Sequence, residues 1–179
     1  MVEANRRVPR AKNMMFMQYA EFATFESTEE LEKRIRGLKP KQFAIVFHDR
    51  DVNDHGVPVG GHWHAMMTFD NARSTRAVAS ALGEPEQFVE AWRGDRRNGL
   101  AYLCHRTDNS RGKFQYDPKD VVANFDYVEE LATWESGVVA ARSGVDIDSL
   151  LDALLEGRVS LEKLKGQLSG SQWSKHHRR

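Results

Sequence analysis

Two apolar segments separated by a polar loop place the tightest constraint on the fold of this chain. Residues 42–48 read QFAIVFH and residues 62–69 read HWHAMMTF, and both have the apolar, aromatic and β-branched composition of strands. Between them, residues 49–61 carry four Asp or Asn residues, three glycines and one proline, a composition typical of a loop. We therefore predict two neighbouring antiparallel strands joined by this loop.

Helical and extended patterns alternate on both sides of this strand pair. Two of the expected helices begin at serines that can cap them, Ser27 and Ser74, and end at glycine or proline. In chain order we predict a strand at 14–22, a helix at 27–38, the two strands above, a helix at 74–82, a short strand at 86–92 and a helix at 96–106. This order predicts an α+β domain with an antiparallel sheet, ferredoxin-like βαββαβ order and helices on one face.

The length and the change of pattern along the chain predict one main domain with a short extension. The chain has 179 residues, of which 40% are hydrophobic, enough to bury a core. Three regions are expected: a basic N-terminal arm at 1–13, a main domain at 14–127, and a helical C-terminal extension at 128–179. Helical patterns recur in that extension at 125–134, 146–157 and 160–168.

Composition excludes some classes of protein. No run of apolar residues reaches the roughly 18 needed to span a membrane, so we expect no membrane partner. The basic N-terminus lacks a small-residue cleavage site, so we expect no signal peptide. The single cysteine, Cys104, excludes an intrachain disulfide framework and fits a cytoplasmic location. The formal net charge is zero, so any role in binding nucleic acid must come from local basic patches.

Histidine and aspartate residues at the facing ends of the two strands form a candidate metal site. His62 and His64 project from the same face of a strand with Cα atoms roughly 6.6 Å apart, and antiparallel pairing would bring His48 and Asp51 close to them. Such ligands suit Mn²⁺ or Mg²⁺, with Zn²⁺ as a further candidate. The alternative is that these are exposed strand histidines. His55, beside Gly56 in the loop, is interpreted as a solvated turn residue.

The segment FHDRDVNDHG…GGHWHAMMTF resembles the metal site of the HUH endonucleases, in particular the replication initiators of rolling-circle plasmids. The name stands for histidine–hydrophobic–histidine, here His62-Trp63-His64. The most similar subgroup has an upstream HDxD motif, here HDRD at 48–51, and a later Tyr-Leu-x-His motif, here YLCH at 102–105. The resemblance covers roughly residues 14–127 and implies that Tyr102 is the catalytic nucleophile.

Without that resemblance, a tyrosine among Leu100, Ala101 and Leu103 is more often a core residue with a hydrogen-bonded hydroxyl. The other tyrosines are interpreted as structural residues: Tyr19, Tyr116 and Tyr127. Many members of the wider superfamily have a lysine three residues after the tyrosine. Here His105 occupies that place, and whether it takes over the role of the lysine stays open.

The resemblance implies site-specific, metal-dependent nicking and joining of DNA. Tyr102 would attack one phosphodiester of single-stranded or extruded origin DNA, leaving a 5′-phosphotyrosine and a free 3′-OH that primes the host replication machinery. Basic and polar residues near the candidate site could contact DNA phosphates or support the site: His105, Arg73, Arg76, Arg97 and Arg106. The helical extension could mediate self-association into a homo-oligomer.

Three other functions fit parts of the pattern. A conjugative or mobilisation relaxase uses the same chemistry, although many relaxases carry the tyrosine ahead of the histidines. A DNA-binding protein could hold a structural metal in a fully ligated site. A metallohydrolase of small phosphate esters would not need Tyr102.

Overall fold

The structure is a computed structural model that describes residues 8–142 and 154–157. The chain divides after Tyr127 into two compact units, residues 1–127 and 128–179. In the second unit, the helix α4 (Tyr127–Arg142) corresponds to the one expected at 125–134 and is longer. Except for residues 154–157, the helices expected farther along lie outside the described residues. No helix in the described part of the chain has both the length and the apolar character of a membrane span.

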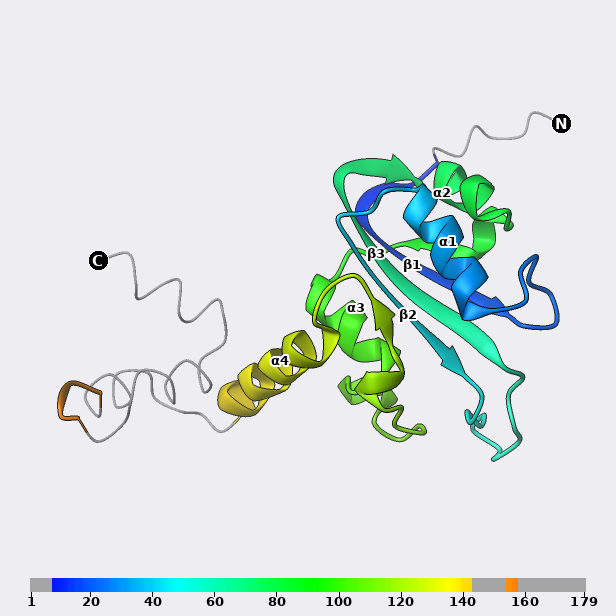
Figure 1. The fold of residues 1–179 in the computed structure, drawn as a ribbon. Helices are drawn as coiled ribbons and strands as arrows, with labels where there is room; N and C mark the ends of the chain where they lie inside the picture. Colours follow the sequence, from blue (N-terminus) through cyan, green and yellow to red (C-terminus); the bar gives the residue numbers. More distant parts are fainter. Residues whose placement is uncertain (1–7, 143–153, 158–179) are drawn as a thin grey trace, which may run out of the picture. The chain divides into compact units, whose positions relative to one another are not determined.

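The first unit follows the expected alternation of strands and helices (Figure 1). Its elements are β1 (Arg10–Tyr19), α1 (Thr28–Gly37), β2 (Gln42–His48), β3 (His62–Ser74), α2 (Thr75–Leu82), β4 (Val89–Ala91), α3 (Arg96–Leu103) and β5 (Val122–Ala123). Short 3-10 turns occur at Glu86–Phe88, Asp108–Ser110 and Pro118–Asp120.

The strands form one antiparallel sheet in the order β4-β1-β3-β2-β5. The first four strands in this order reproduce the arrangement of a ferredoxin-like βαββαβ unit, so the predicted fold class is confirmed. The sequence did not predict β5, which consists of two residues paired to Ala44 and Ile45 of β2.

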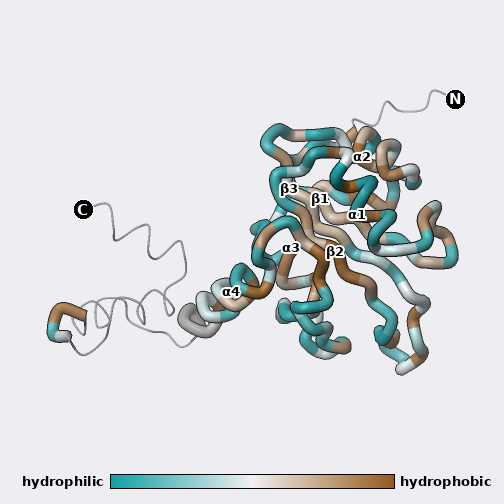
Figure 2. Tube along the Cα trace, in the orientation of Figure 1, coloured by the Kyte–Doolittle hydropathy of each residue, from teal (hydrophilic) through white to brown (hydrophobic). Residues whose placement is uncertain are grey.

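Alternate residues of the strands build a hydrophobic core on one face of the sheet. Hydrophobic residues run along the central strands, while hydrophilic residues dominate the loops at their ends (Figure 2). The sheet contributes Met14, Phe16, Phe43, Ile45, Trp63, Ala65, Met67, Phe69 and Val89, and the two helices α1 and α2 contribute Leu31, Ile35, Val78, Ala79 and Leu82. These two helices therefore cover the same face, as the sequence predicts.

The helix α3 packs against the opposite face of the sheet. Its Leu103 carbonyl accepts a hydrogen bond from His48 of β2, and its Gly99 lies against Met66 of β3. A Cβ added to Gly99 would come within 2.9 Å of Met66 Cε and 3.2 Å of Trp92 Cε2. Glycine therefore permits the close approach of α3 to the sheet, and the expectation of helices on one face holds only for α1 and α2.

Local sequence signals set the ends of the helices as expected. The Ser27 and Ser74 side chains accept hydrogen bonds from the backbone N–H groups of Glu30 and Ala77, which caps α1 and α2. Gly83 ends α2 in the left-handed conformation with φ of 76°, which glycine adopts without the steric cost of a Cβ.

Strand boundaries differ more from the prediction. β1 starts at Arg10, inside the expected N-terminal arm, and β3 extends five residues beyond Phe69. These two extensions pair with each other, Arg10 opposite Ser74. The apolar pattern marks only the buried part of a strand, whereas backbone pairing continues into polar residues. In the expected strand at 86–92, only Val89–Ala91 is extended, because a 3-10 turn follows Pro85.

Candidate metal centre

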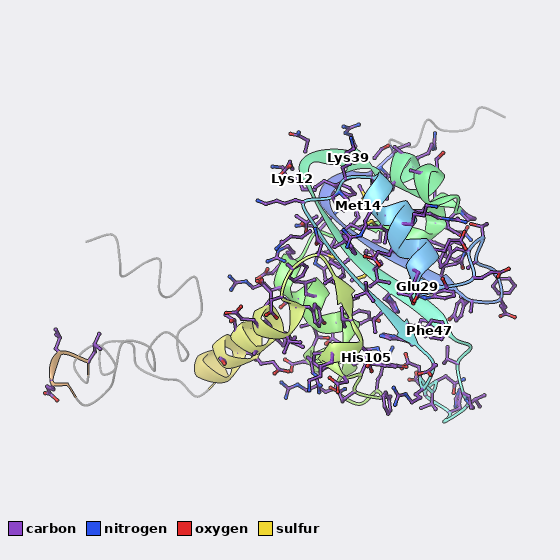
Figure 3. All side chains as sticks on the ribbon, viewed as in Figure 1. Lys12, Met14, Glu29, Lys39, Phe47 and His105 are labelled. Atoms are coloured by element: carbon purple, nitrogen blue, oxygen red, sulfur yellow. The ribbon has the colours of Figure 1, made fainter. Side chains whose placement is uncertain are left out.

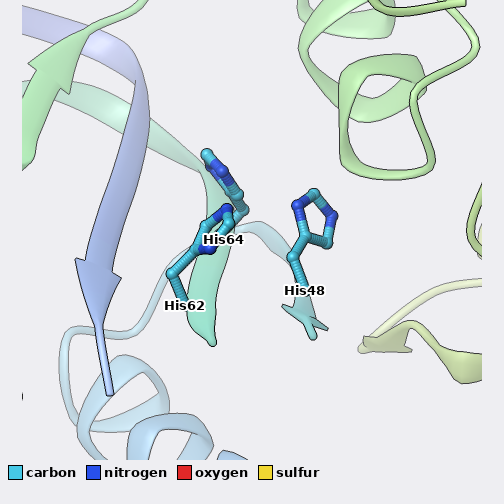
Figure 4. Close-up of side chains that lie close together, drawn as sticks. All are labelled: His48, His62 and His64. Atoms are coloured by element: carbon cyan, nitrogen blue, oxygen red, sulfur yellow. The ribbon is translucent and has the colours of Figure 1, made fainter. Parts of the chain in front are cut away.

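Antiparallel pairing of β2 and β3 brings three histidines together at one end of the sheet. His48 lies directly opposite His62, and Val46 lies opposite His64. The ring of His48 is 5.2 Å from that of His62 and 4.8 Å from that of His64, measured between centroids. All three side chains are buried and project from the same side of the sheet (Figure 4). Trp63, between two of them, packs into the opposite core against Phe25.

The loop after β2 returns Asp51 to this cluster. A bridge between Val52 and Pro58 closes the loop, and the Val59 N–H donates to the Asp51 carbonyl. The Asp51 carboxylate is buried, with Oδ2 at 3.6 Å from His48 Nδ1 and 3.7 Å from His62 Nε2. The structure thus brings together His48, Asp51, His62 and His64, the four residues predicted as metal ligands. His55 is exposed in the same loop, as expected.

His105 is a further member of the cluster. It follows α3 (Figure 3) and is fully buried. Its Nε2 lies 3.7 Å from Asp51 Oδ2, and its ring lies 4.5 Å from that of His48 between centroids. Two overlapping groups could therefore hold a metal ion: His48 with His62 and His64, and His48 with Asp51 and His105.

Backbone carbonyls fix the orientation of three of the imidazoles. His48 Nε2 donates to the Leu103 carbonyl at 2.7 Å, His62 Nδ1 to the Gly60 carbonyl at 2.8 Å, and His105 Nδ1 to the Phe114 carbonyl at 2.7 Å. Because a carbonyl oxygen only accepts, each of these nitrogens carries the ring proton in the neutral imidazole, and the other nitrogen keeps its lone pair. Histidines that ligate metals are usually held in this way.

The remaining nitrogens create an electrostatic problem that a cation would solve. His48 Nδ1, His64 Nδ1 and His105 Nε2 are buried and have no hydrogen-bond partner among the described residues. Such an unpartnered polar atom costs about 1–3 kcal/mol, and two of these three face the Asp51 carboxylate. A divalent ion beside Asp51 could accept the lone pairs of His48 Nδ1 and His105 Nε2. The residues present therefore fit a bound metal ion.

Burial keeps these imidazoles neutral and able to act as ligands. Burial, together with neighbouring imidazoles, lowers the pKa of His48 to about 4 and holds the pKa of His64 well below its usual value. Burial also lowers the pKa of His105, although the hydrogen bond to Phe114 opposes this shift. A neutral imidazole offers a lone pair to a metal ion, whereas a protonated one does not.

Tyr116 supports the centre in a way that the sequence did not reveal. Its ring stacks on His48 at 4.1 Å between centroids with an interplanar angle of 6°. Its buried hydroxyl donates to Asp51 Oδ1 at 3.1 Å and accepts from the Arg50 N–H at 2.9 Å. Its interpretation as a packing residue was therefore incomplete. No local pattern links it to Asp51, because the two residues lie 65 positions apart in the chain.

Tyr102 lies at the edge of the cluster. Its ring is 5.6 Å from that of His64 and 5.8 Å from that of His105, in edge-on contacts. It is partly exposed, unlike Tyr116 and Tyr127, whose side chains are buried. The Tyr127 hydroxyl donates to the Leu100 carbonyl at 2.7 Å, which is a structural role. Tyr19 is the other partly exposed tyrosine, with its ring 5.4 Å from that of His62.

The arginines expected to contact DNA are placed differently from one another. Arg73 and Arg76 lie at the end of β3 far from His62 and at the start of α2, away from the histidines. Arg76 pairs with Glu86. Arg97 lies in the first turn of α3. Arg106 donates to Gln115 Oε1 and to the Tyr116 carbonyl, so it supports the segment that carries Tyr116.

Comparisons with known proteins identify the family of this chain. Residues 6–128 match the family described as "Plasmid replication protein, origin binding domain". A replication protein of Onion yellows phytoplasma (strain OY-M) is 31% identical over 101 residues, which are 50% of this chain and 26% of that protein. A replication protein of Staphylococcus aureus is 23% identical over 159 residues, 89% of this chain and 68% of that protein.

The phytoplasma protein is much longer than the part that is matched, since the match spans about a quarter of it. The family match, in contrast, covers the whole of the sheet, the histidine cluster and α3. The chain therefore belongs to the rolling-circle family of plasmid replication proteins and carries their origin-binding domain.

Proposed function

We propose that this chain nicks and rejoins one strand of its plasmid origin through a covalent tyrosine intermediate that depends on a divalent metal ion. In this proposal Tyr102 is the nucleophile, and His48, Asp51, His62 and His64 bind the metal ion. The origin-binding domain brings the plasmid origin to the site. The observation that carries the proposal is the partly exposed ring of Tyr102 beside the buried cluster of imidazoles.

The ligand set favours a transition metal over magnesium. Mg²⁺ prefers oxygen ligands and keeps several waters, whereas His48, His62 and His64 offer nitrogen. Imidazole nitrogens combined with a carboxylate suit Mn²⁺, Zn²⁺ and neighbouring ions. We therefore expect Mn²⁺ to bind more tightly than Mg²⁺. A bound divalent ion would polarise the scissile phosphate and offset negative charge that develops in the transition state.

The chain itself supplies and positions the nucleophile. The phenolic oxygen of Tyr102 forms a bond to the phosphorus while the bond from phosphorus to the 3′-oxygen of the preceding nucleotide breaks. The phenol proton leaves to solvent, and the released 3′-oxygen takes up a proton. The products are a 5′-phosphotyrosine and a free 3′-OH. The reverse reaction rejoins the strand without ATP, because the phosphotyrosine keeps the energy of the broken bond.

The position of Tyr102 on α3 supports this role. The phenol of a tyrosine has an ordinary pKa near 10 and is a weak nucleophile unless it is held close to an activated phosphorus. The packing of Gly99 on Met66 holds α3 against the face of the sheet that carries His62 and His64, here called the histidine face. The hydrogen bond from His48 to the Leu103 carbonyl ties the same helix to the centre, one residue after Tyr102.

The test is a nicking assay with Tyr102→Phe. Single-stranded oligonucleotides tiled across the plasmid's own origin are incubated with protein and Mn²⁺, then separated on a denaturing gel. With a 3′ label, the wild type should give a slowly migrating protein–DNA adduct; with a 5′ label, it should give a shortened strand ending in 3′-OH. Tyr102→Phe should abolish both products while it keeps the fold and Mn²⁺ binding, since it removes only one oxygen.

Tyr19→Phe is the matched control, because Tyr19 is the other partly exposed tyrosine beside a site imidazole. It should form the adduct normally. An adduct with Tyr102→Phe but not with Tyr19→Phe would assign the nucleophile to Tyr19. Origin binding with no adduct in the wild type would instead favour a DNA-binding protein with a structural metal. Hydrolysis of small phosphate esters that survives Tyr102→Phe would favour a metallohydrolase.

A further inference from the structure

His105 occupies a backbone position that an ordinary side chain rarely adopts. It follows α3 with φ of 56°, in the left-handed region that costs a non-glycine residue roughly 1–2 kcal/mol. Its N–H donates to the Tyr102 carbonyl at 3.0 Å, and the N–H of Arg106 donates to the Ala101 carbonyl at 2.9 Å. These two bonds form a Schellman motif, in which glycine is the usual residue at the place of His105. The imidazole must therefore offset this strain.

The environment of the His105 imidazole is that of a metal ligand. The side chain has no exposed surface, and its Nδ1 donates to the Phe114 carbonyl. Its Nε2 faces Asp51 Oδ2 and has no hydrogen-bond partner among the described residues. A lone pair that faces a carboxylate in a buried site is unfavourable unless a cation lies between them.

The distances from Asp51 do not distinguish His105 from two predicted ligands. Asp51 Oδ2 lies 3.6 Å from His48 Nδ1, 3.7 Å from His62 Nε2 and 3.7 Å from His105 Nε2. Two atoms that bind one ion at about 2.1 Å lie about 3.0–4.2 Å apart in tetrahedral or octahedral shells. All three separations fall in this range.

We propose that His105 Nε2 binds the same divalent ion as His48 and Asp51, and that it thereby ties the ion to the end of the helix that carries Tyr102. This inference rests on the proposed function only for the presence of the ion. His105 is three residues after Tyr102, and the two rings are 5.8 Å apart between centroids. Binding of the ion at His105 would fix the last turn of α3 and so position the Tyr102 hydroxyl. His105 is thus a metal ligand and a positioning residue for the nucleophile.

The decisive experiment compares Mn²⁺ binding to His105→Asn and His55→Asn. Asparagine tolerates the left-handed conformation better than most residues, so the backbone of the Schellman motif should persist, and circular dichroism checks the fold. Isothermal titration of chelator-treated protein with MnCl₂ should show at least about tenfold weaker binding for His105→Asn, as for other losses around a metal centre. His55→Asn makes the same change in an exposed loop and should bind as the wild type does.

A second measurement on the wild-type chain does not depend on a variant that folds. In the Co²⁺-substituted protein, each ligating imidazole with a ring N–H gives one exchangeable proton resonance with a hyperfine shift. Four such resonances are expected with His105 as a ligand and three without it. At saturating Mn²⁺, His105→Asn should also lower kcat for nicking more than it changes KM for the oligonucleotide, because the position of Tyr102 is altered and DNA contacts are not.

The outcomes separate this inference from the proposed function. If the wild type binds Mn²⁺ and His105→Asn binds it equally well, or if Co²⁺ gives only three shifted resonances, the inference is wrong and the proposed function stands. If the wild type binds no divalent ion, both fail. If His105→Asn binds weakly but nicks at the wild-type rate when Mn²⁺ saturates it, His105 is a ligand without a positioning role.

Discussion

The two faces of the sheet use the same strands for different purposes. Along β3, Trp63, Ala65 and Met67 enter the core under α1 and α2, whereas His62 and His64 project to the other face. The first face is apolar and closed by two helices. The second buries polar groups that lack partners, and it is covered by α3, which also carries Tyr102.

This difference separates stability from function within single strands. Successive side chains of a strand point to opposite faces, so neighbouring residues can contribute to the core and to the site without touching the same atoms. The core face stabilises the fold by burying apolar surface. The histidine face lowers the stability of the metal-free chain, because unpartnered buried nitrogens have a cost that a bound ion would remove. The variants below test whether the two faces are independent.

The largest expected effect is the loss of stability caused by Phe16→Ala, on the core face of the sheet. The Phe16 side chain is fully buried in the core of β1, and loss of a buried Phe side chain typically costs 3–5 kcal/mol. Urea unfolding of the metal-free protein should show a loss of about this size. Mn²⁺ affinity of the folded variant at low temperature should match that of the wild type. A parallel loss of Mn²⁺ affinity would show that the two faces are coupled.

The next effect is the loss of Mn²⁺ affinity caused by His64→Ala, on the histidine face. Loss of a ligand should weaken Mn²⁺ binding by more than the roughly 10–100-fold typical of a lost hydrogen-bond partner of a ligand. Stability of the metal-free protein should fall less than with Phe16→Ala, since an unpartnered nitrogen is removed with the ring. Trp63→Phe, the sequence neighbour on the other face, is the matched control: it should lower stability and leave Mn²⁺ binding intact. Equal metal affinities of His64→Ala and the wild type would remove His64 from the ligand set.

The comparison of faces also explains what the sequence could predict. Strand alternation and antiparallel pairing are local rules, so His62 and His64 could be placed on one face with His48 opposite, and the structure agrees. The helix caps at Ser27, Ser74 and Gly83 were equally local. The match of motif order to a known family added Tyr102 as a candidate.

The contacts of Tyr116 and His105 with Asp51 depend on long-range packing, and the sequence did not predict them. For His105 the sequence predicted only that it could support the site or contact DNA. The hydroxyl of Tyr116 meets Asp51 across 65 residues, and His105 reaches Asp51 only because α3 packs on the histidine face. The expectation of helices on one face failed for α3 for the same reason: no periodicity in residues 96–106 indicates which side of a sheet the helix will cover. The pairing of polar residues at the ends of β1 and β3 was also not predicted, because an apolar pattern marks only the buried part of a strand.

Tyr116→Phe should lower Mn²⁺ affinity less than His64→Ala does. The change removes a hydroxyl that donates to Asp51 and accepts from Arg50, while the ring can still stack on His48. Mn²⁺ affinity should fall roughly 10–100-fold, because Asp51 loses a partner that orients it. The free energy of unfolding should fall by about 0.5–1.5 kcal/mol for a lost hydrogen bond.

Tyr127→Phe is the matched control for that variant. It removes another buried hydroxyl, which donates to the Leu100 carbonyl, so a similar loss of stability is expected. Mn²⁺ affinity should not change. If both variants lose metal affinity equally, the hydroxyl of Tyr116 has no specific role at the centre.

The last expected effect is a dependence of stability on pH that arises from the histidine face. Burial lowers the pKa of His48 from 6.5 to about 4 and lowers that of His64 well below 6.5. Between the lowered pKa of each group in the folded chain and pH 6.5, the unfolded chain binds protons that the folded chain excludes. The metal-free fold should therefore lose stability as the pH falls below 6.5, on the order of 1 kcal/mol per pH unit for each such group. Above pH 7.5 these groups are neutral in both states and contribute no slope.

Unfolding in urea with a chelator at pH 7.5, 6.5 and 5.5 measures this slope. His48→Phe keeps a ring on Tyr116 and removes one titrating group, so its slope should be shallower. His55→Asn should keep the wild-type slope, because the histidine it replaces is exposed. With Mn²⁺ present the slope should steepen, since protons then compete with the ion for the same lone pairs. A metal-free fold equally stable at pH 7.5 and 5.5 would mean that the imidazoles are not buried in their neutral form, and the contrast between the two faces would lose its electrostatic basis.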